Sequence, residues 1–290
     1  MGKSVWQLAA MTCLAMVAFA ANSLLNRVAV ESGAADPGSF AVIRVLSGAV
    51  MLAFLCALQK RRMSFELRDR VVGAGSLTLY MVGFSMAYLT MDAGLGALLL
   101  FGTVQITMLA LGGKRLGSAQ VVGAAIAFAG LAFVLWPDGK VETDLTAVGF
   151  MIAAGLGWGL YSLAGRGARD PLAATGANFV VSLPLTLAAV WLFGEAWDVN
   201  WKGVGFAVVS GAVTSGLGYA LWYRVLPRLD TSVAATVQLS VPVIAIAGGG
   251  VFLGEVISTR LILGTILVLG GIGVAIRFAA KPTQTGESNA

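Results

Sequence analysis

The sequence contains no histidine, only two cysteines, and charged side chains at just 11% of its 290 positions. Cys13 and Cys56 both fall inside long apolar stretches, which argues against a disulfide framework and against a cysteine-based metal site. The fourteen acidic residues lie in polar breaks or at the ends of apolar stretches. A catalytic site needs a metal cluster or a nucleophile beside a base, and this distribution offers neither. We therefore expect no enzyme activity, no cofactor and no bound metal.

Hydrophobic residues make up 58% of the chain and fall in long blocks. A helix needs about 20 mainly apolar residues to cross the hydrocarbon core of a bilayer. The blocks predict an all-α membrane protein with ten transmembrane helices, at residues 6–30, 38–59, 70–90, 94–112, 118–136, 146–165, 171–193, 203–226, 231–253 and 259–277. Ten spans use roughly 200 residues, which leaves no segment long enough for a soluble domain.

The basic residues indicate how these spans are oriented. With the N-terminus in the cytoplasm, the predicted cytoplasmic segments hold fourteen of the nineteen Lys and Arg residues, and the opposite side holds three. The remaining two, Arg27 and Arg44, lie within predicted spans. We therefore expect a multi-pass protein of the bacterial inner membrane with both termini cytoplasmic, lipids as partners, and no nucleic-acid binding. Residues 279–290 are polar and are expected to form a disordered cytoplasmic tail.

The two halves of the chain repeat each other. Gly123 and Gly130 in the first half correspond to Gly264 and Gly271 in the second, at a constant offset of 141 residues. Each half contains five predicted spans, and because five is odd the second half must enter the membrane from the opposite side. We therefore expect two inverted five-helix repeats, residues 1–137 and residues 138–278. Such a pair is typical of a transporter that alternates between inward-open and outward-open states about a central site.

Four short motifs resemble one transporter family. They are Arg44 in the second span, Trp158-Gly159 in the sixth, Val241-Pro242-Val243 in the ninth, and Phe252-Leu253-Gly254-Glu255 after it. In this order the motifs resemble the EamA-type members of the drug/metabolite transporter (DMT) superfamily, and the resemblance covers nearly the whole chain. It implies a basket-shaped bundle in which spans 1–4 and 6–9 line a central cavity and spans 5 and 10 are peripheral. Within the family, the cavity chemistry is most similar to the aromatic amino acid exporters of the YddG kind.

The first span carries three polar side chains, Asn22, Ser23 and Asn26. Asn22 and Asn26 are four residues apart and therefore lie on one face of a helix, where both amides could bind a substrate carboxylate or ammonium. Gln238 adds an amide in the ninth span. We interpret these four residues as substrate-binding. Hydrogen bonding between helices is the alternative, because an unpaired amide is costly in lipid.

Aromatic side chains recur at helical spacing in the third, sixth and eighth spans. A ring can stack on such side chains when they share one helix face, so a cluster of them is suited to a flat substrate. We interpret six of them as walls of a substrate pocket: Tyr80, Phe84, Trp158, Tyr161, Tyr219 and Trp222. The alternative is ordinary packing between helices, or an aromatic belt at the membrane interface.

Arg44 and Pro242 are the candidate gating residues. Arg44 lies about six residues into the second span, close enough to the external interface for its side chain to reach the headgroups, which is the structural interpretation. The functional interpretation is capture of a substrate carboxylate, or an external gate closed by an ion pair with Glu31 or Asp36. Pro242 has no backbone N–H and is expected to bend the ninth span near the middle of the bilayer.

These observations predict a transporter that exports small neutral or zwitterionic metabolites, above all amino acids and in particular aromatic ones. Its partners would be the small-molecule substrate and membrane lipids, and it would act as a monomer or homodimer. An efflux pump for lipophilic drugs or toxic compounds on the same fold is the alternative. A channel and a structural protein without transport are the further alternatives. Because the predicted spans lack Asp, Glu and His away from their ends, we do not expect obligatory coupling to protons.

Overall fold

A computed structural model of the chain describes residues 2–112, 117–136, 144–165, 168–192, 197–229 and 237–277. These residues form helices and connecting loops, with one isolated antiparallel bridge between Ala35 and Val199. The elements are, in chain order, α1 (Gly2–Glu31), α2 (Pro37–Leu58), α3 (Leu67–Ala87), α4 (Ala93–Leu111), α5 (Ser118–Leu135), α6 (Leu145–Gly165), α7 (Pro171–Leu192), α8 (Trp201–Val208), η1 (Val209–Leu217), α9 (Gly218–Val225), η2 (Leu226–Arg228), α11 (Ser240–Gly248), η3 (Gly249–Leu253) and α12 (Thr259–Arg277). The predicted tail and the first residues of the predicted ninth span lie outside the described residues.

Eight of the described helices are long and apolar enough to cross a membrane. They are α1, α2, α4, α5, α6, α7, α12, and the continuous helix Trp201–Val225 that α8, η1 and α9 form together. Two predicted spans are not among these eight. One corresponds to α3, which carries Arg68, Asp69 and Arg70 near its start, and the other to the shorter apolar helix Ser240–Leu253. The all-α prediction is confirmed for the described residues, and the count of ten spans stays a prediction.

The side chains are distributed as in a protein surrounded by lipid. Large apolar side chains such as Phe54, Phe128 and Ile266 are exposed on the outside of the bundle, whereas polar side chains such as Asn22 and Arg44 are buried inside it. A soluble monomer rarely exposes so much contiguous apolar surface and rarely buries a charged residue completely. The exterior of the bundle therefore matches lipid, and its interior holds the polar chemistry.

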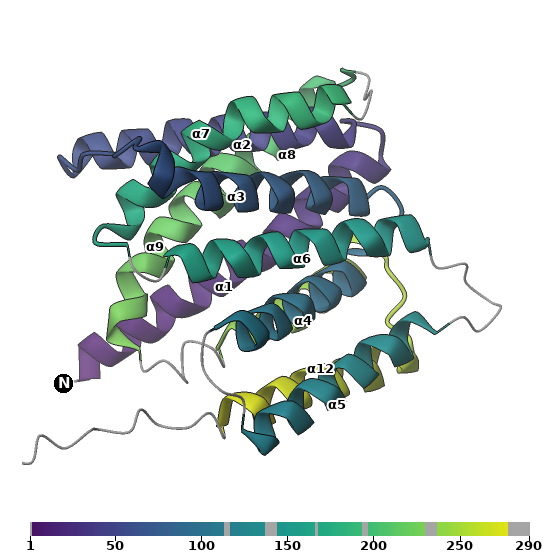
Figure 1. The fold of residues 1–290 in the computed structure, drawn as a ribbon. Coiled ribbons are helices and arrows are strands. Elements are labelled where there is room, and N and C mark those ends of the chain that lie inside the picture. The colour runs from purple at the N-terminus through teal and green to yellow at the C-terminus, as the bar shows by residue number, and fades with distance from the viewer. Residues whose placement is uncertain are drawn as a thin grey trace, which may run out of the picture.

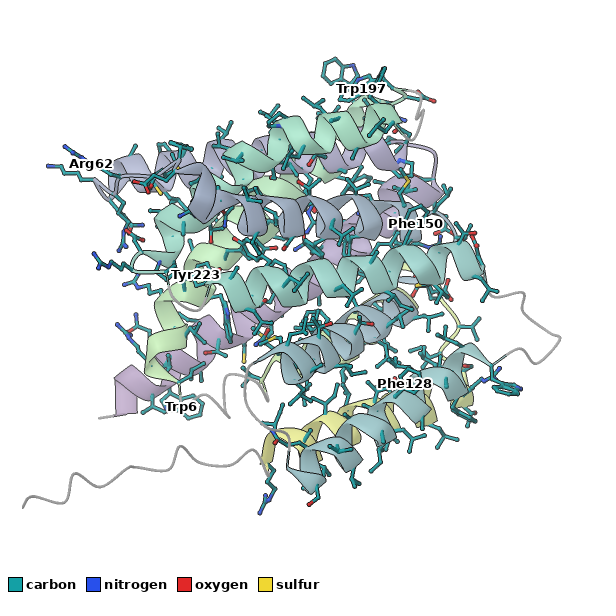
Figure 2. The ribbon with its side chains drawn as sticks, viewed as in Figure 1. Trp6, Arg62, Phe128, Phe150, Trp197 and Tyr223 are labelled. Carbon is teal, nitrogen blue, oxygen red and sulfur yellow. The ribbon has the colours of Figure 1, made fainter. Side chains whose placement is uncertain are left out.

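The two ends of the bundle carry different residues. Trp6 and Arg62 lie at one end, together with the N-terminus, and Trp197 lies at the other end (Figures 1 and 2). Trp6 is 79% exposed and Trp197 is 59% exposed. Tryptophan is enriched at both membrane–water interfaces, because its ring is apolar and its N–H is polar. The two ends of the helices thus have the character of two membrane surfaces.

The helices lie side by side in layers (Figure 1). α3 packs against α6 and α7, α2 packs against α7 and η1, and α1 packs against η1, α9 and α11. α4 packs against α6 and α11. α5 and α12 pack on each other at the edge of the molecule and contact the other helices chiefly through α4 (Figure 1). Their place at the edge matches the peripheral position that the family resemblance implies.

Glycines bring α5 and α12 into backbone contact. A Cβ atom added at Gly123 would lie 2.5 Å from the carbonyl oxygen of Gly271, and one added at Gly271 would lie 2.5 Å from the carbonyl oxygen of Gly123. Further along the same two helices, a Cβ atom at Gly264 would lie against Val134 and 3.4 Å from the carbonyl oxygen of Gly130. Small residues allow such close packing in lipid, where burial of apolar surface does not drive helices together.

The ninth predicted span is interrupted one turn before Pro242. A turn at Leu239 precedes α11, which begins at Ser240, so Pro242 lies in the first turn of that helix. A helix leaves its first backbone N–H groups without intrahelical partners, so a proline costs little there. The interruption thus falls one turn before the proline, where its missing N–H leaves a carbonyl without an intrahelical partner, and a bend of the span stays a prediction.

Candidate functional site

Asn22 of α1 faces the π-helical segment η1. Its side-chain oxygen Oδ1 accepts hydrogen bonds from Ser210 Oγ at 2.8 Å, from Thr214 Oγ1 at 2.5 Å and from Ser215 Oγ at 3.5 Å. All four side chains are buried. π-helical turns are rare in proteins, and those that occur are often found at functional sites. These three hydroxyls were not among the predicted site residues, although their spacing places them near one face of a helix rich in small residues.

Arg44 of α2 is completely buried beside this cluster. Its Nη2 donates to Tyr80 Oη at 2.9 Å, and its Nε and Nη2 lie 3.4 Å and 3.3 Å from Ser215 Oγ. The guanidinium carbon lies 4.9 Å from the centroid of the Phe84 ring and 5.3 Å from that of the Tyr80 ring. Hydrogen bonds and cation–π contacts thus hold the charge inside the bundle.

The prediction that Arg44 reaches the external headgroups is wrong, because its guanidinium points into the bundle. The suggested ion pairs with Glu31 and Asp36 are also wrong. Glu31 pairs with Arg27, with 3.0 Å between nitrogen and oxygen, and Asp36 accepts a hydrogen bond of 2.8 Å from the backbone N–H of Ser39 at the start of α2. Asp36 also accepts from the backbone N–H of Asp198 at 2.9 Å. Both carboxylates are therefore engaged elsewhere.

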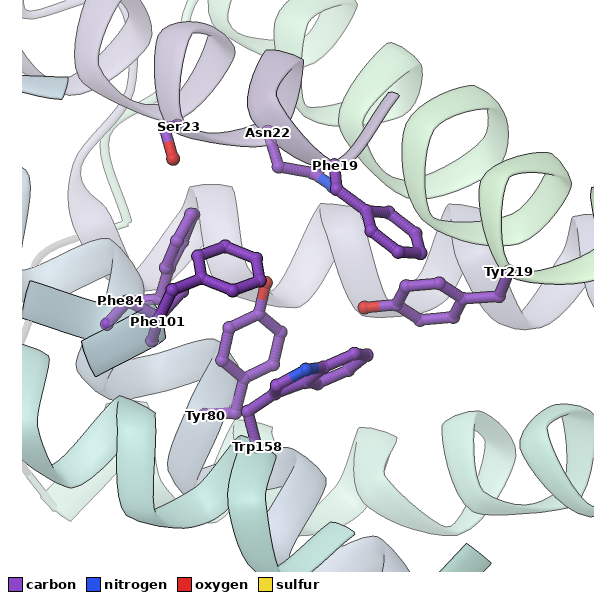
Figure 3. A pocket seen from close by; sticks show the side chains of 9 residues that line it. Phe19, Asn22, Ser23, Tyr80, Phe84, Phe101, Trp158 and Tyr219 are labelled. Atoms are coloured by element: carbon purple, nitrogen blue, oxygen red, sulfur yellow. The ribbon is translucent and has the colours of Figure 1, made fainter. Parts of the chain in front are cut away.

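A central pocket lies between α1, α3, α4, α6 and α9 (Figure 3). It is lined by Phe19, Asn22, Ser23, Tyr80, Phe84, Leu100, Phe101, Trp158 and Tyr219. Its volume is about 20 Å³. A cavity of this size holds about one water molecule. In this conformation the pocket is too small for an amino acid, so a substrate of that size can enter only after the helices move apart.

Trp158 of α6 is at the centre of an aromatic wall. Its ring centroid lies 5.0 Å from that of Tyr80, 5.4 Å from that of Tyr161 and 5.2 Å from that of Tyr219. Tyr80, Trp158 and Tyr219 come from three different helices, and Asn22 lies across the pocket from Trp158 (Figure 3). The wall offers ring faces for stacking, and the side of α1 offers polar groups.

Six of the ten predicted substrate-binding residues line the central pocket: Asn22, Ser23, Tyr80, Phe84, Trp158 and Tyr219. The structure brings these six together from α1, α3, α6 and α9, which are far apart in the sequence. The sequence analysis did not predict three further lining residues, Phe19, Leu100 and Phe101. Single apolar side chains in a membrane span carry no signal that separates a pocket wall from a lipid-facing surface.

The other four predicted residues do not line this pocket. Asn26 donates from Nδ2 to Ser85 Oγ at 3.0 Å and so links α1 to α3, which matches the alternative of hydrogen bonding between helices. Tyr161 donates to Thr175 Oγ1 at 3.1 Å, behind Trp158. Trp222 packs edge-on against Phe19, and Gln238 lies outside the lining.

Arg27 fastens one end of the bundle. Its Nη1 donates to the carbonyl oxygens of Tyr88 and Leu89, each at 3.2 Å, just after α3 ends. Its Nη2 lies 3.0 Å from the carboxylate of Glu31 and 3.6 Å from that of Asp92. Arg27 therefore holds the end of α1 against the connection between α3 and α4.

Glu255 fastens the same connection from the other side. Its carboxylate accepts hydrogen bonds from the backbone N–H groups of Ala93 at 2.6 Å and Gly94 at 3.2 Å, in the first turn of α4. Burial raises the pKa of this carboxyl group above its ordinary value, and the two hydrogen bonds oppose the rise only in part. From the sequence, Glu255 was recognised only as part of the motif Phe252-Leu253-Gly254-Glu255, and this role was not predicted.

At the opposite end, side chains tie α7 to its neighbours. Arg61, after α2, forms an ion pair of 2.8 Å with Asp170, before α7. Arg70 of α3 donates to Asn178 Oδ1 of α7 at 3.1 Å. Contacts between helices are thus present at both ends of the bundle.

The comparisons with known proteins agree with this architecture. Residues 145–277 match the model of the EamA-like transporter family. Over 92% of its length the chain is 45% identical to an uncharacterized protein of Pseudomonas aeruginosa, and the match covers 93% of that protein. A solved crystal structure aligns with a TM-score of 0.67 at 20% sequence identity, over 96% of this chain and 99% of that one, which shows the same fold.

Two further relatives have names that state a function. The chain is 30% identical to the threonine/homoserine exporter RhtA of Escherichia coli over 58% of its own length and 56% of that protein. It is 27% identical to a "Probable amino-acid metabolite efflux pump" of Salmonella typhimurium over 64% of its own length and 68% of that protein.

The family match covers the second half of the chain, the similarity to the Pseudomonas protein covers nearly all of it, and the bundle has an apolar exterior around a polar pocket. The resemblance found in the sequence is thereby confirmed: the chain belongs to the EamA-type transporters of the drug/metabolite transporter superfamily and is a multi-pass protein of the bacterial inner membrane.

Proposed function

We propose that this protein exports small neutral or zwitterionic metabolites, namely amino acids and in particular aromatic ones, by alternating access about the central pocket. The observation that carries the proposal is the pocket, where the rings of Tyr80, Trp158 and Tyr219 lie across from the amide of Asn22. Ring faces hold a flat side chain, and the amide holds a polar end. The names of the relatives from Escherichia coli and Salmonella typhimurium support amino-acid substrates and outward transport.

The small size of the pocket supports alternating access as the mechanism. With a volume of about 20 Å³, the pocket has no room for an amino acid in this conformation. Arg27 and Glu255 close one end of the bundle, and the Arg61–Asp170 pair lies at the other. We propose that this is the intermediate between two open states, and that substrate enters when one set of contacts is released at a time.

We further propose that the chain has ten spans in two inverted halves, residues 1–137 and 138–278. The contacts between α5 and α12 support this. Gly123 contacts Gly271 as Gly264 contacts Gly130, and the two contacts are related by the offset of 141 residues. An internal twofold axis produces such reciprocal contacts.

The proposed orientation places both termini in the cytoplasm. Arg62 lies at the same end of the bundle as the N-terminus (Figures 1 and 2). Basic residues are enriched on the cytoplasmic side of membrane proteins, which supports that end as the cytoplasmic one. We propose that the protein acts as a monomer or homodimer.

A second candidate function follows from the lining. Six of its nine residues are aromatic: Phe19, Tyr80, Phe84, Phe101, Trp158 and Tyr219. An aromatic lining also suits flat lipophilic compounds, so drug efflux is the alternative substrate class. The two candidates differ in whether the pocket needs the polar groups of an amino acid.

The proposal is tested with purified protein in proteoliposomes. Uptake of labelled phenylalanine, tryptophan, threonine and a lipophilic cation is measured with and without a pH gradient, against protein-free liposomes. We expect saturable uptake of the amino acids, fastest for the aromatic ones and independent of the gradient. Uptake of the lipophilic cation alone, driven by the gradient, would replace this proposal with drug efflux.

A further inference from the structure

Arg44 is a buried cation whose charge is not neutralised by a carboxylate within the described part of the chain. The ion pairs found there involve Arg27 and Arg61, and the hydrogen-bond partners of Arg44 are the neutral side chains of Tyr80 and Ser215. Its Nη1 is buried and has no partner in the same part of the chain. A buried charge without a counter-ion is strongly disfavoured, and a bound anion removes that cost.

Two hydrogen-bonded connections lead from Arg44 to the central pocket. Tyr80 lines the pocket, and its hydroxyl oxygen accepts from Arg44 Nη2. Ser215 also accepts from Arg44, and it donates to the side-chain oxygen of Asn22, which lines the pocket as well. The positive charge of Arg44 therefore lies just behind the pocket wall and is connected to it by two hydrogen-bonded paths.

The Tyr80 hydroxyl is a donor without an acceptor among the described residues. Its oxygen already accepts a hydrogen bond from Arg44, so its own hydrogen is available for another group. Figure 3 shows this hydroxyl directed into the space that the lining side chains enclose. A hydroxyl polarised by an adjacent cation is a stronger donor, above all to an anion.

The described residues that line the pocket include no acidic one, so an ammonium group there would meet an amide, hydroxyls, ring faces and an apolar side chain. Arg44 gives the site a charge of one positive unit. A carboxylate neutralises this charge, whereas a cation adds to it in surroundings that screen charge poorly.

We infer that the central pocket recognises its ligand through a carboxylate, which accepts a hydrogen bond from the Tyr80 hydroxyl and is held by the charge of Arg44. This inference rests on the proposed function and narrows its substrate class to compounds with a free carboxylate, organic acids as well as amino acids. The ammonium group of an amino acid contributes little to binding. Organic cations are excluded.

The competing explanation is that Arg44 only links helices. It joins α2 to α3 through Tyr80 and to η1 through Ser215, so its loss would also weaken the bundle. A purely structural role changes the amount of folded protein and weakens all ligands equally. Recognition of a carboxylate changes the order of preference among ligands, which is the quantity to measure.

The test uses four compounds that share one ring: phenylalanine, 3-phenylpropionate without the ammonium, phenylalaninamide without the carboxylate, and phenethylamine. Each unlabelled compound competes with labelled phenylalanine for uptake into proteoliposomes. We expect 3-phenylpropionate to compete within a few-fold of phenylalanine. The amide and the amine are expected to be weaker by about 10-fold to 100-fold, the range that corresponds to one charge-assisted hydrogen bond. Equal competition by the amide and the acid would overturn the inference.

Variants assign the preference to the two residues. Arg44→Gln and Tyr80→Phe are each expected to lower the preference for acid over amide by about tenfold or more. Arg44→Lys keeps the positive charge and should therefore keep part of the preference for acid over amide. Arg260→Gln is the matched control, because Arg260 donates to the carbonyl oxygen of Phe133 at the edge of the molecule and lies outside the lining. An unchanged preference in Tyr80→Phe, which removes a single oxygen, would overturn the inference even if Arg44→Gln fails to fold.

Binding is measured separately from transport. Quenching of tryptophan fluorescence by the same four compounds in detergent, measured as the part of the signal that Trp158→Phe abolishes, reports occupancy near Trp158 without requiring flux. Selective quenching by the two carboxylates with no uptake of any compound would contradict the proposed export function and would support the carboxylate site. Saturable uptake of amino acids together with equal quenching by compounds with and without a carboxylate would support the export function and contradict the carboxylate site.

Discussion

The carboxylate of Glu255 accepts a hydrogen bond of 2.6 Å from the backbone N–H of Ala93, the first residue of α4. Asp92 stands at the N-cap position of that helix, but its side chain makes no capping hydrogen bond. A residue 162 positions further along the chain thus satisfies the first donors of α4. Glu255 thereby fixes the loop after η3 to the end of a helix that lines the pocket.

The titration of Glu255 predicts a pH dependence of stability. Burial raises its pKa above the ordinary 4.5, so the folded protein favours the neutral carboxyl group more than the unfolded chain does. This contribution to stability is complete below about pH 4.5 and is lost as the pH rises through the raised pKa. As the pH rises from about 4.5 through the raised pKa of Glu255, the melting temperature of the wild type should fall relative to that of Glu255→Gln, which does not titrate. Thermal unfolding in detergent from about pH 4 to about pH 8 measures it, and parallel curves for the two proteins would refute the prediction.

Removal of the Arg27 contacts should open the end of the bundle that they close. Arg27→Gln loses an ion pair and charge-assisted hydrogen bonds to two carbonyl oxygens. Each such bond corresponds to about a tenfold change in an opening equilibrium. The probe is a Ser23→Cys variant that lacks the two native cysteines. A membrane-impermeant maleimide, added from the side of the membrane at which Arg27 lies, should react with this cysteine about tenfold faster when Arg27 is replaced by Gln. The same reaction rate with and without Arg27 would show that these contacts do not hold the end closed.

Close packing of α5 on α12 should make Gly271 intolerant of any side chain. A Cβ atom there would lie 2.5 Å from the carbonyl oxygen of Gly123 and 2.6 Å from the backbone nitrogen of Ala127. We expect Gly271→Ala to destabilise the protein by about 1–3 kcal/mol, because backbone atoms cannot move aside as a flexible side chain does. Gly270→Ala is the matched control, since nothing lies within 4 Å of its added Cβ. Thermal unfolding of both variants measures the difference, and equal melting temperatures would contradict the contact.

Trp158→Ala should impair transport without loss of protein from the membrane. Trp158 stacks with Tyr161 and contacts Tyr80 and Tyr219, so its removal takes the centre out of the aromatic wall. We expect the concentration of phenylalanine for half-maximal uptake to rise about tenfold, since an aromatic contact is worth about 1 kcal/mol and several are lost. Trp191→Ala, at a side chain that is 79% exposed on α7, should leave uptake unchanged. Normal uptake in Trp158→Ala would place the substrate elsewhere.

Much of the fold was predictable from the sequence because lipid restricts what the chain can do. A segment that crosses the bilayer must satisfy its own backbone hydrogen bonds, so each long apolar block becomes a helix. The predicted bounds of 118–136 and 171–193 differ from those of α5 and α7 by one residue at most. The family was predictable for the same reason, since its motifs recur in order along these helices.

The site was predictable only as a set of residues. The sequence showed that Asn22, Tyr80 and Trp158 lie in apolar spans, where polar and aromatic side chains serve either packing or binding. It did not show which helix each one faces, because that depends on how the helices rotate and pair over long sequence separations. Asn26 and Tyr161 also lie in apolar spans and were predicted on the same grounds, but in the tertiary structure both form hydrogen bonds to neighbouring helices.

Composition and periodicity alone determined that this chain is a helical membrane protein with polar and aromatic groups inside its spans. Only the tertiary structure decided that Arg44 points inward and shares hydrogen bonds with Tyr80 and Ser215, 36 and 171 residues away. It also decided that Glu255 caps α4 and that the pocket in this conformation is too small for an amino acid. The physical reason is the sequence separation of the interactions. An apolar segment in lipid forms a helix through hydrogen bonds within its own backbone, whereas the partners of a buried charge are side chains that only folding brings beside it.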